Sequence, residues 1–306
     1  MVGKNSETIM KEKAEVGPLK SIFELQVLKY FGLRKRKMVH ENDYSFLDLP
    51  EILEVLFPVA YSPLYFRVPS YPLPGITCFI EVETGIKIGC GFWARGKELP
   101  TILYFHGNGE TVDGYDWIAR FYNERGINLF VADYRGYGLS NGRPTVSNML
   151  SDAHQIFRGF KNIIEKEGYR SALFVMGRSL GSLPAIELAY HYQDELKGLI
   201  VESGSANNFR RLWSYLKPRE REEFLGESPL LNKVKIRAIH IPTCIIHGEY
   251  DELLPLEEGM ELYQNSGAAE KDLLIIPAAG HNDLMIKGHE LYFGKIKEFV
   301  QQALKA

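Results

Sequence analysis

Ser171–Tyr192, which reads SALFVMGRSLGSLPAIELAYHY, contains the pattern that decides the fold. Its first part, Ala172–Met176, is a short apolar run of the kind that forms a buried strand. A tight corner follows at Gly177–Gly181, and Leu183–Tyr192 returns as a mostly apolar helix. Strand, corner and helix in this order are the setting in which a Gly-x-Ser-x-Gly motif strains its serine and exposes the hydroxyl. The sequence therefore predicts Ser179 as a nucleophile.

The same five-residue pattern occurs a second time, at Gly138–Gly142. The strand before it is expected to end near Ala132, and Pro144 follows two residues after its last glycine, which indicates an irregular loop. We therefore expect Ser140 to be a loop residue.

The composition is that of a globular protein large enough to bury a sizeable core. The chain has 306 residues and a net charge of -3, which gives no electrostatic argument for a nucleic-acid partner. Its three cysteines, Cys78, Cys90 and Cys244, are too few for a disulfide framework and fit a reducing compartment. No stretch resembles a signal peptide or is long enough to span a membrane. We expect a cytoplasmic protein without a transmembrane segment.

Residues 1–70 are expected to form a partly helical N-terminal extension. Within it, Leu19–Leu33 is apolar and the basic run Arg34–Lys37 follows. The favoured interpretation is a helix that packs on the body of the protein, and the alternative is peripheral contact of residues 19–37 with a membrane surface. Leu47–Ala60 is expected to be a short helix that ends at Pro58.

Residues 71–306 show the regular alternation of a single large domain. Ile76–Glu83 and Ile86–Trp93 are predicted to form a hairpin, which would place Cys78 opposite Cys90 as two thiols. From Thr101 onward apolar strands alternate with amphipathic helices, which indicates a mainly parallel sheet with helices on both faces. The further strands are expected at Thr101–Phe105, Ile127–Ala132, Ala172–Met176, Gly198–Val201, Thr243–Ile246 and Asp272–Ile276.

A serine hydroxyl needs a base to accept its proton and a third group to orient that base. His281 follows the last strand and a glycine, so a loop can place its imidazole at the edge of the sheet where the strands end. Asp251, after the penultimate strand, is the expected acid, with Glu202 as the alternative. Asp283 is expected to be a helix cap. His106 and His247 also follow strands, but they are expected to be structural.

An attacking serine also generates an oxyanion that needs hydrogen-bond donors. The backbone N–H of Leu180 lies at the start of the helix after the corner, and that of Asn108 lies in the glycine-rich loop His106–Gly109. We predict that these two groups form the oxyanion hole.

Several motifs in this order resemble the α/β-hydrolase superfamily, in particular its small-cap serine esterase, thioesterase and prolyl-oligopeptidase-like branch. They are His106–Gly109, Asp133–Ser140, Gly177–Gly181, His247–Asp251 and Gly280–His281. The resemblance covers about residues 76–306. It implies an α/β-hydrolase fold with an eight-stranded, mostly parallel sheet, and it implies a triad of Ser179, Asp251 and His281. It also implies that there is no cofactor, and we expect no catalytic metal.

Residues 203–237 are expected to form a small helical cap. Phe209, Leu212 and Trp213 can line one helical face there, and we predict that they contact an apolar group of the substrate. We therefore expect a serine hydrolase that cleaves carboxylic esters of small molecules, with thioesters as a further substrate class. The alternatives are a peptidase of the prolyl-oligopeptidase-like type and a non-catalytic ligand-binding protein on the same fold.

Overall fold

A computed structural model describes residues 44–61, 76–170, 172–208, 228 and 230–305. The chain divides into two compact units, Met1–His40 and Glu41–Ala306, and the first lies outside the described residues. The predictions for residues 19–37, for a boundary between residues 70 and 71, and for most of the cap also lie outside them. Among the described residues, no helix combines the length and the apolar character needed to cross a membrane.

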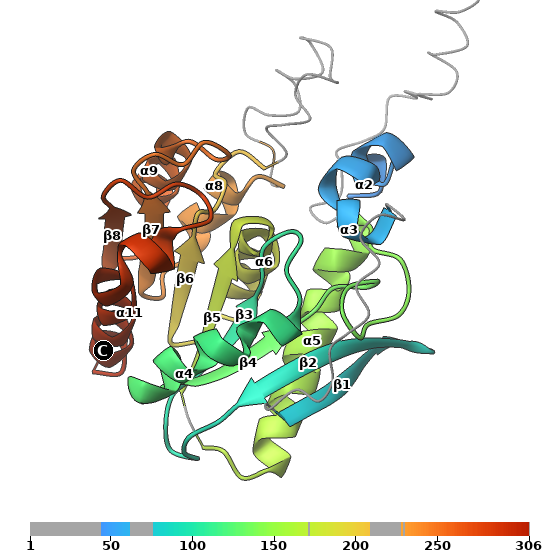
Figure 1. Ribbon diagram of the computed structural model, residues 1–306, viewed down its shortest axis with the longest axis horizontal. Coiled ribbons are helices and arrows are strands. Elements are labelled where there is room, and N and C mark those ends of the chain that lie inside the picture. Colours follow the sequence, from blue (N-terminus) through green and yellow to red (C-terminus); the bar gives the residue numbers. More distant parts are fainter. Residues whose placement is uncertain (1–43, 62–75, 171, 209–227, 229, 306) are drawn as a thin grey trace, which may run out of the picture. The chain divides into compact units, whose positions relative to one another are not determined.

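One eight-stranded sheet organises the described part of the chain, with the strand order β1-β2-β4-β3-β5-β6-β7-β8 (Figure 1). The hairpin strands β1 and β2 are antiparallel to each other, β2 is antiparallel to β4, and the other neighbours are parallel. The prediction of a mostly parallel α/β sheet with a hairpin at one edge is confirmed. The strands are β1 Ile76–Glu83, β2 Ile86–Trp93, β3 Thr101–Phe105, β4 Asn128–Ala132, β5 Leu173–Arg178, β6 Gly198–Glu202, β7 Thr243–Gly248 and β8 Lys271–Ile276.

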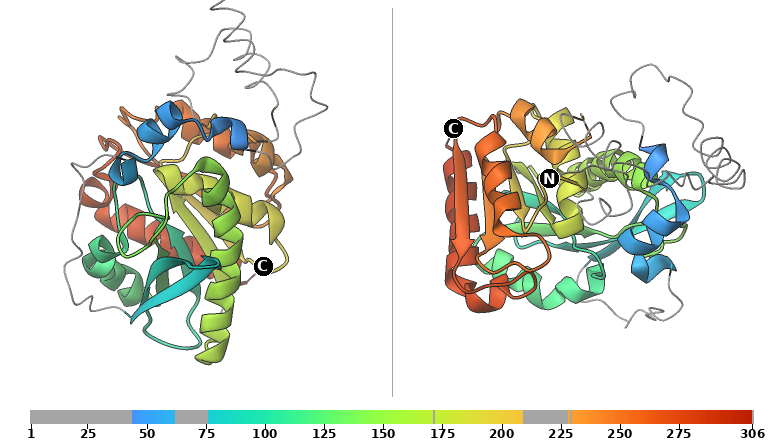
Figure 2. Two further views of the ribbon diagram at one scale, coloured as in Figure 1. Left: turned by 90° about the vertical axis from the view of Figure 1, so that its right-hand side faces the viewer. Right: turned by 90° about the horizontal axis from the view of Figure 1, so that it is seen from above.

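Helices cover both faces of the sheet, which Figure 2 shows in its view from above. Because strand side chains alternate, Leu103 and Phe105 of β3 pack in a core with α5 and α6, whereas Ile102 and Tyr104 face a second core with α4 and α11. The helices longer than one turn are α2 Pro50–Leu56, α4 Asp116–Glu124, α5 Val146–Lys166, α6 Ser182–His191, α9 Leu256–Asn265 and α11 His289–Ala303. The single-turn helices are α3 Pro58–Tyr61, α8 Asn232–Lys235 and α10 Leu284–Lys287.

Pro58 begins a helix instead of ending one, so the prediction for Leu47–Ala60 was wrong in this detail. Helix α2 ends at Leu56, and Pro58 is the first residue of α3. A proline fits the first position of a helix because the N–H that it lacks would have no partner inside that helix. Ile52 of α2 and the neighbouring Phe57 are buried in the same core as α5.

Asn208, which follows β6, is hydrogen-bonded to residues at the start of α8. The side chain of Asn208 donates to the backbone oxygen of Leu230 at 2.8 Å, and its Oδ1 accepts the N–H of Asn232 at 3.1 Å. Asn208 and Asn232 are both buried. One asparagine therefore links residue 208 to residues 230 and 232.

Candidate active site

Ser179 occupies a strained corner directly after β5. Its φ is 51°, in the left-handed region that non-glycine residues rarely adopt. The 3-10 turn Ser179–Gly181 (η4) links the strand to α6. Strand, strained serine and helix are the local geometry that the sequence predicted.

The two glycines of the corner leave room for close backbone contacts. A Cβ on Gly177 would lie 2.1 Å from the oxygen of Gly181, and a Cβ on Gly181 would lie 2.1 Å from the oxygen of Phe105. Both distances are far below van der Waals contact, and both neighbours are backbone atoms that cannot rotate away. Any side chain at either position would therefore force the turn apart.

Gly177→Ala is expected to lower the free energy of unfolding by about 1–3 kcal/mol, because the new methyl group overpacks the corner. The matched control is Gly294→Ala in α11, where an added Cβ meets nothing within 4 Å. That substitution should raise stability by about 0.5–1 kcal/mol, since alanine favours a helix over glycine. Urea denaturation of both variants measures the difference, and equal effects would contradict the tight corner.

The side chains of Ser179, His281 and Asp251 meet at the ends of strands β5, β8 and β7. Nε2 of His281 lies 2.9 Å from Oγ of Ser179, and Nδ1 of the same ring lies 2.7 Å from Oδ2 of Asp251. His281 and Asp251 are only 4% and 5% exposed. The structure thus brings the three predicted residues within proton-transfer distance of one another.

The carboxylate of Asp251 is held in place from several sides. Its Oδ1 accepts the N–H groups of Leu253 and Leu254 at 2.9 and 2.8 Å. Burial raises the pKa of Asp251, but the hydrogen bonds from His281 and Leu254 outweigh burial and bring this pKa below its usual 3.8. His247 donates to the oxygen of Leu254 when Nε2 carries the proton (2.8 Å), so it supports the same loop. An ionised, fixed Asp251 can orient the imidazole of His281.

The stability that Asp251 contributes is expected to depend on pH. A carboxyl group with a lowered folded pKa stabilises the protein above its unfolded pKa of about 4, and this stabilisation is lost as the pH falls through the folded value. The deficit of Asp251→Asn in free energy of unfolding should therefore be full at neutral pH and shrink below about pH 4. Urea denaturation of both proteins across this range measures the deficit. A deficit that does not change with pH would contradict the lowered pKa.

The loop after β3 brings Asn108 to the same edge of the sheet. Oδ1 of Asn108 accepts a hydrogen bond from the hydroxyl of Tyr137 at 2.8 Å. His106 is fully buried, with Nε2 3.1 Å from Asp133, and its backbone oxygen accepts from the hydroxyl of Tyr134 at 2.6 Å. The motif that carries Asp133, Tyr134 and Tyr137 therefore supports the loop that was predicted to supply an oxyanion donor. Leu180, the other predicted donor, is buried in the turn after Ser179.

Arg178 is a residue of the site that the sequence analysis missed. Its guanidinium is buried and forms ion pairs with Glu110 and with Glu202, the latter at 3.2 Å. It also donates to the backbone oxygen of His281 at 2.8 Å and to Oδ1 of Asn282 at 2.9 Å. Burial opposes the charge on Arg178, but the two carboxylates outweigh it and raise its pKa above the usual value. Arg178 thus ties the nucleophile strand to the histidine loop.

Two other residues considered in the sequence analysis, Glu202 and Ser140, are hydrogen-bonded outside the contacts of Ser179, His281 and Asp251. Glu202, the alternative acid, is buried against Arg178 and accepts from the hydroxyls of Tyr104 and Tyr292 at 3.1 and 2.6 Å. Ser140 lies in the loop after β4, where its Oγ accepts the N–H of Gly89 at 2.9 Å.

Asp283 precedes α10 as predicted, but its side chain does not cap the helix. It accepts the N–H of Gly280 at 2.7 Å instead, because the histidine loop folds back toward it. The predicted substrate residues Phe209, Leu212 and Trp213 lie outside the described residues.

Comparison with known proteins places this chain in a family. The profile of the family described as "Serine aminopeptidase, S33" matches residues 96–216. Alpha/beta hydrolase domain-containing protein 17B of Homo sapiens is 30% identical over 236 residues, which cover 75% of this chain and 76% of that protein. Protein 17C of Xenopus tropicalis is 27% identical and covers 73% of this chain and 69% of its own length.

Solved structures show the same fold. An esterase from Pyrococcus furiosus superposes with a TM-score of 0.63 at 20% identity and covers 77% of this chain and 97% of its own. Est1E from Butyrivibrio proteoclasticus, solved with ferulic acid, gives a TM-score of 0.62 at 19% identity, with 75% and 100% covered. The sheet order and the relatives agree with the resemblance found in the sequence. The chain is therefore a hydrolase of the α/β-hydrolase superfamily.

Proposed function

We propose that the protein is a serine hydrolase that cleaves carboxylic esters or thioesters through an acyl-enzyme on Ser179. The observation that carries the proposal is the continuous chain of contacts from Ser179 through His281 to Asp251, at 2.9 and 2.7 Å. A hydroxyl, an imidazole and a buried carboxylate in this order can activate the hydroxyl as a nucleophile.

The proposed reaction has two halves. In the first, Ser179 Oγ attacks the acyl carbon, Nε2 of His281 takes the hydroxyl proton, and the same nitrogen then protonates the departing alcohol or thiol. In the second, water attacks the acyl-enzyme while His281 takes its proton; the bond from the acyl carbon to Ser179 Oγ then breaks, His281 returns the proton to Oγ, and the acid is released. Asp251 holds the imidazole in orientation, while the N–H groups of Asn108 and Leu180 stabilise the oxyanion in both halves.

The acyl group is the part of the substrate that we assign to residues 203–237. In this proposal Phe209, Leu212 and Trp213 contact an apolar acyl or aryl group. Among the similar solved structures, one is an esterase and another is a monoglyceride lipase, which supports an ester substrate.

A peptidase acting on short peptides is the second candidate, and the description of the matched family profile favours it. Such an enzyme needs a free carboxylate to bind the amino terminus of its substrate. Glu110 lies next to the site, but its oxygens are engaged by Arg178 and by the hydroxyl of Tyr115 at 2.5 Å. Because Glu110 is already engaged, we favour the ester proposal over the peptidase.

A fluorophosphonate probe tests the nucleophile. The purified protein should be labelled on Ser179, and labelling should disappear in Ser179→Ala but persist in the control Ser140→Ala. Labelling that survives in Ser179→Ala would contradict the proposal.

A panel of p-nitrophenyl esters, acyl thioesters and aminoacyl anilides then separates the substrate classes. Turnover of esters or thioesters above the anilides is the expected result. Preference for the anilides would favour the peptidase, and no turnover by folded protein would favour a ligand-binding role.

A further inference from the structure

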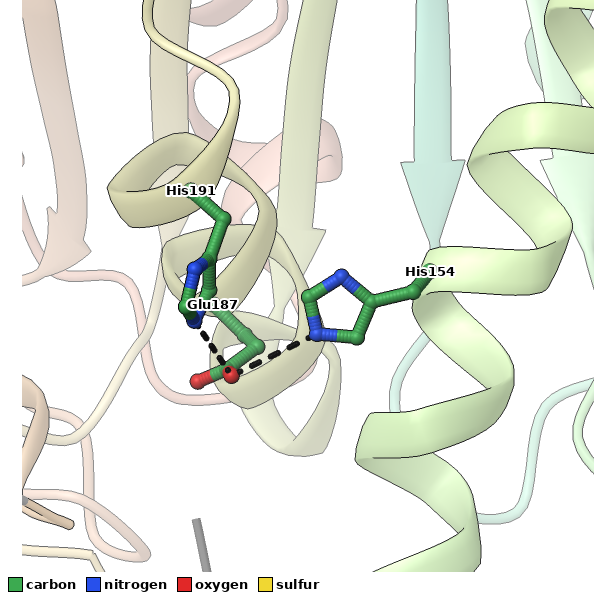
Figure 3. Close-up of side chains that lie close together, drawn as sticks. All are labelled: His154, Glu187 and His191. Carbon is green, nitrogen blue, oxygen red and sulfur yellow. Dashed lines mark hydrogen bonds and ion pairs between the residues drawn. The ribbon is translucent and has the colours of Figure 1, made fainter. Parts of the chain in front are cut away.

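Two histidines and a glutamate meet on the helical face of the sheet that carries α5 and α6. Figure 3 shows His154 on α5 and both Glu187 and His191 on α6, with the two rings directed toward the same carboxylate. Residues four apart in a helix share a face, which explains why Glu187 and His191 lie together. This cluster, His154–Glu187–His191, plays no part in the proposed reaction.

The spacing of the cluster suits a transition metal. Nε2 of His191 and Nε2 of His154 lie 3.1 and 3.5 Å from Oε1 of Glu187. One ligand atom from each of the three residues lies within 4.8 Å of the others. Ligands on a tetrahedral Zn²⁺, bound at 2.0–2.1 Å, are separated by about 3.3 Å. The two distances to the carboxylate are close to this value, and a three-ligand site requires the two rings to turn toward each other.

The carboxylate of Glu187 is buried and held in place by a lysine. Glu187 is 2% exposed, and its second oxygen, Oε2, is ion-paired with the buried ammonium of Lys235. Lys235 thus fixes the carboxylate with Oε1 toward the histidines, although its positive charge also reduces the attraction for a cation.

One histidine has a hydrogen-bond partner at the ring nitrogen that faces away from the cluster. Nδ1 of His154 lies 3.0 Å from the hydroxyl of Tyr192. With a proton on Nδ1 donated to that hydroxyl, Nε2 presents its lone pair to the cluster. The side chains of His154 and His191 are 23% and 33% exposed, so an ion can enter and a water molecule can complete the coordination.

We propose that His154, Glu187 and His191 form a Zn²⁺ site, in which two imidazole nitrogens, one carboxylate oxygen and a water bind the ion. This site is separate from the active site, because Ser179 lies in the turn before α6, and Glu187 lies a further five residues along the helix from its first residue, Ser182, about 7.5 Å at 1.5 Å per residue. Zinc there would join the end of α6 to α5. It would stabilise the fold in proportion to its occupancy and leave the chemistry to Ser179.

Titration calorimetry with zinc chloride on the chelator-treated full chain tests the site. The expected result is one Zn²⁺ per chain, with affinity at least about tenfold weaker in His154→Gln and in His191→Gln. The matched control is His289→Gln, because His289 also lies beside a glutamate, at 3.8 Å from Glu290, without a second histidine in the pair. This control should bind zinc as the wild type does.

Thermal denaturation with and without zinc provides the second measurement. Zinc should raise the Tm of the wild type and of His289→Gln, and this shift should vanish in the two cluster variants. Absence of zinc binding by the wild type would overturn the proposal, whatever the stability of the variants. Zinc binding that is equally tight in the cluster variants would also overturn it, and inhibition of ester hydrolysis would then place the ion at His281.

Discussion

Ser179→Ala and His281→Ala are each expected to lower kcat for ester hydrolysis by about 10⁴–10⁶-fold, and the double variant is expected to lose no more than either single variant. The reason is that the two side chains act as one unit. The hydroxyl 2.9 Å from Nε2 is a weak nucleophile without the imidazole, and the imidazole has no proton to accept without the hydroxyl.

Steady-state rates on a p-nitrophenyl ester, measured for both single variants and the double variant, test this coupling. Ser140→Ala is the control, because Ser140 lies in the loop after β4, where its hydroxyl accepts a hydrogen bond from the N–H of Gly89. The Ser140→Ala variant should keep the kcat of the wild type. Losses that multiply in the double variant would show that the two residues act independently, and the acyl-enzyme route would then fail.

The second large effect is expected from Arg178→Met. This substitution leaves Glu202 and Glu110 without their cation, and an uncompensated buried charge costs about 3–5 kcal/mol of the free energy of unfolding. It also removes the hydrogen bond to the backbone oxygen of His281, so the imidazole should lose its position and kcat should fall. Urea denaturation and ester kinetics measure the two effects.

Arg135→Met separates these two effects. Arg135 forms two hydrogen bonds with Asp152, at 2.6 and 2.7 Å, and one with Glu83. Its loss should lower stability while kcat per folded molecule stays close to that of the wild type. Arg178→Lys retains the charge without the planar fork and should lie between wild type and Arg178→Met. If Arg178→Met keeps its kcat, then Arg178 stabilises the protein but does not position His281.

The local parts of this structure could be predicted from the sequence, whereas contacts across the sheet could not. The corner at Ser179 depends on residues within one strand, one turn and one helix, so the pattern around Gly177 and Gly181 was sufficient. Arg178 was missed because its importance arises from the pairing of β5 with β6, which sets it opposite Glu202. The spacing of apolar residues along the sequence does not indicate which residues of two strands lie opposite each other.

The predicted ends of several helices and strands were wrong for a related reason. Strand β5 was predicted to end at Met176, where the apolar run stops, but it continues through Arg178, because pairing with β6 holds the polar end in the sheet. Strand β7 likewise continues through Gly248, opposite Ile276 of β8. The proline at position 58 was interpreted as a terminator because the sequence alone does not distinguish the residue after one helix from the first residue of the next.

The junction at Asn208 has a consequence for how this protein can change over evolutionary time. Since Asn208 is bonded to Leu230 and Asn232, the number of residues between positions 208 and 230 can change at little entropic cost to the sheet. Under the proposal that residues 203–237 contact the acyl group, new preferences among substrates can arise there by recombination, while the chemistry proposed at Ser179 is inherited unchanged.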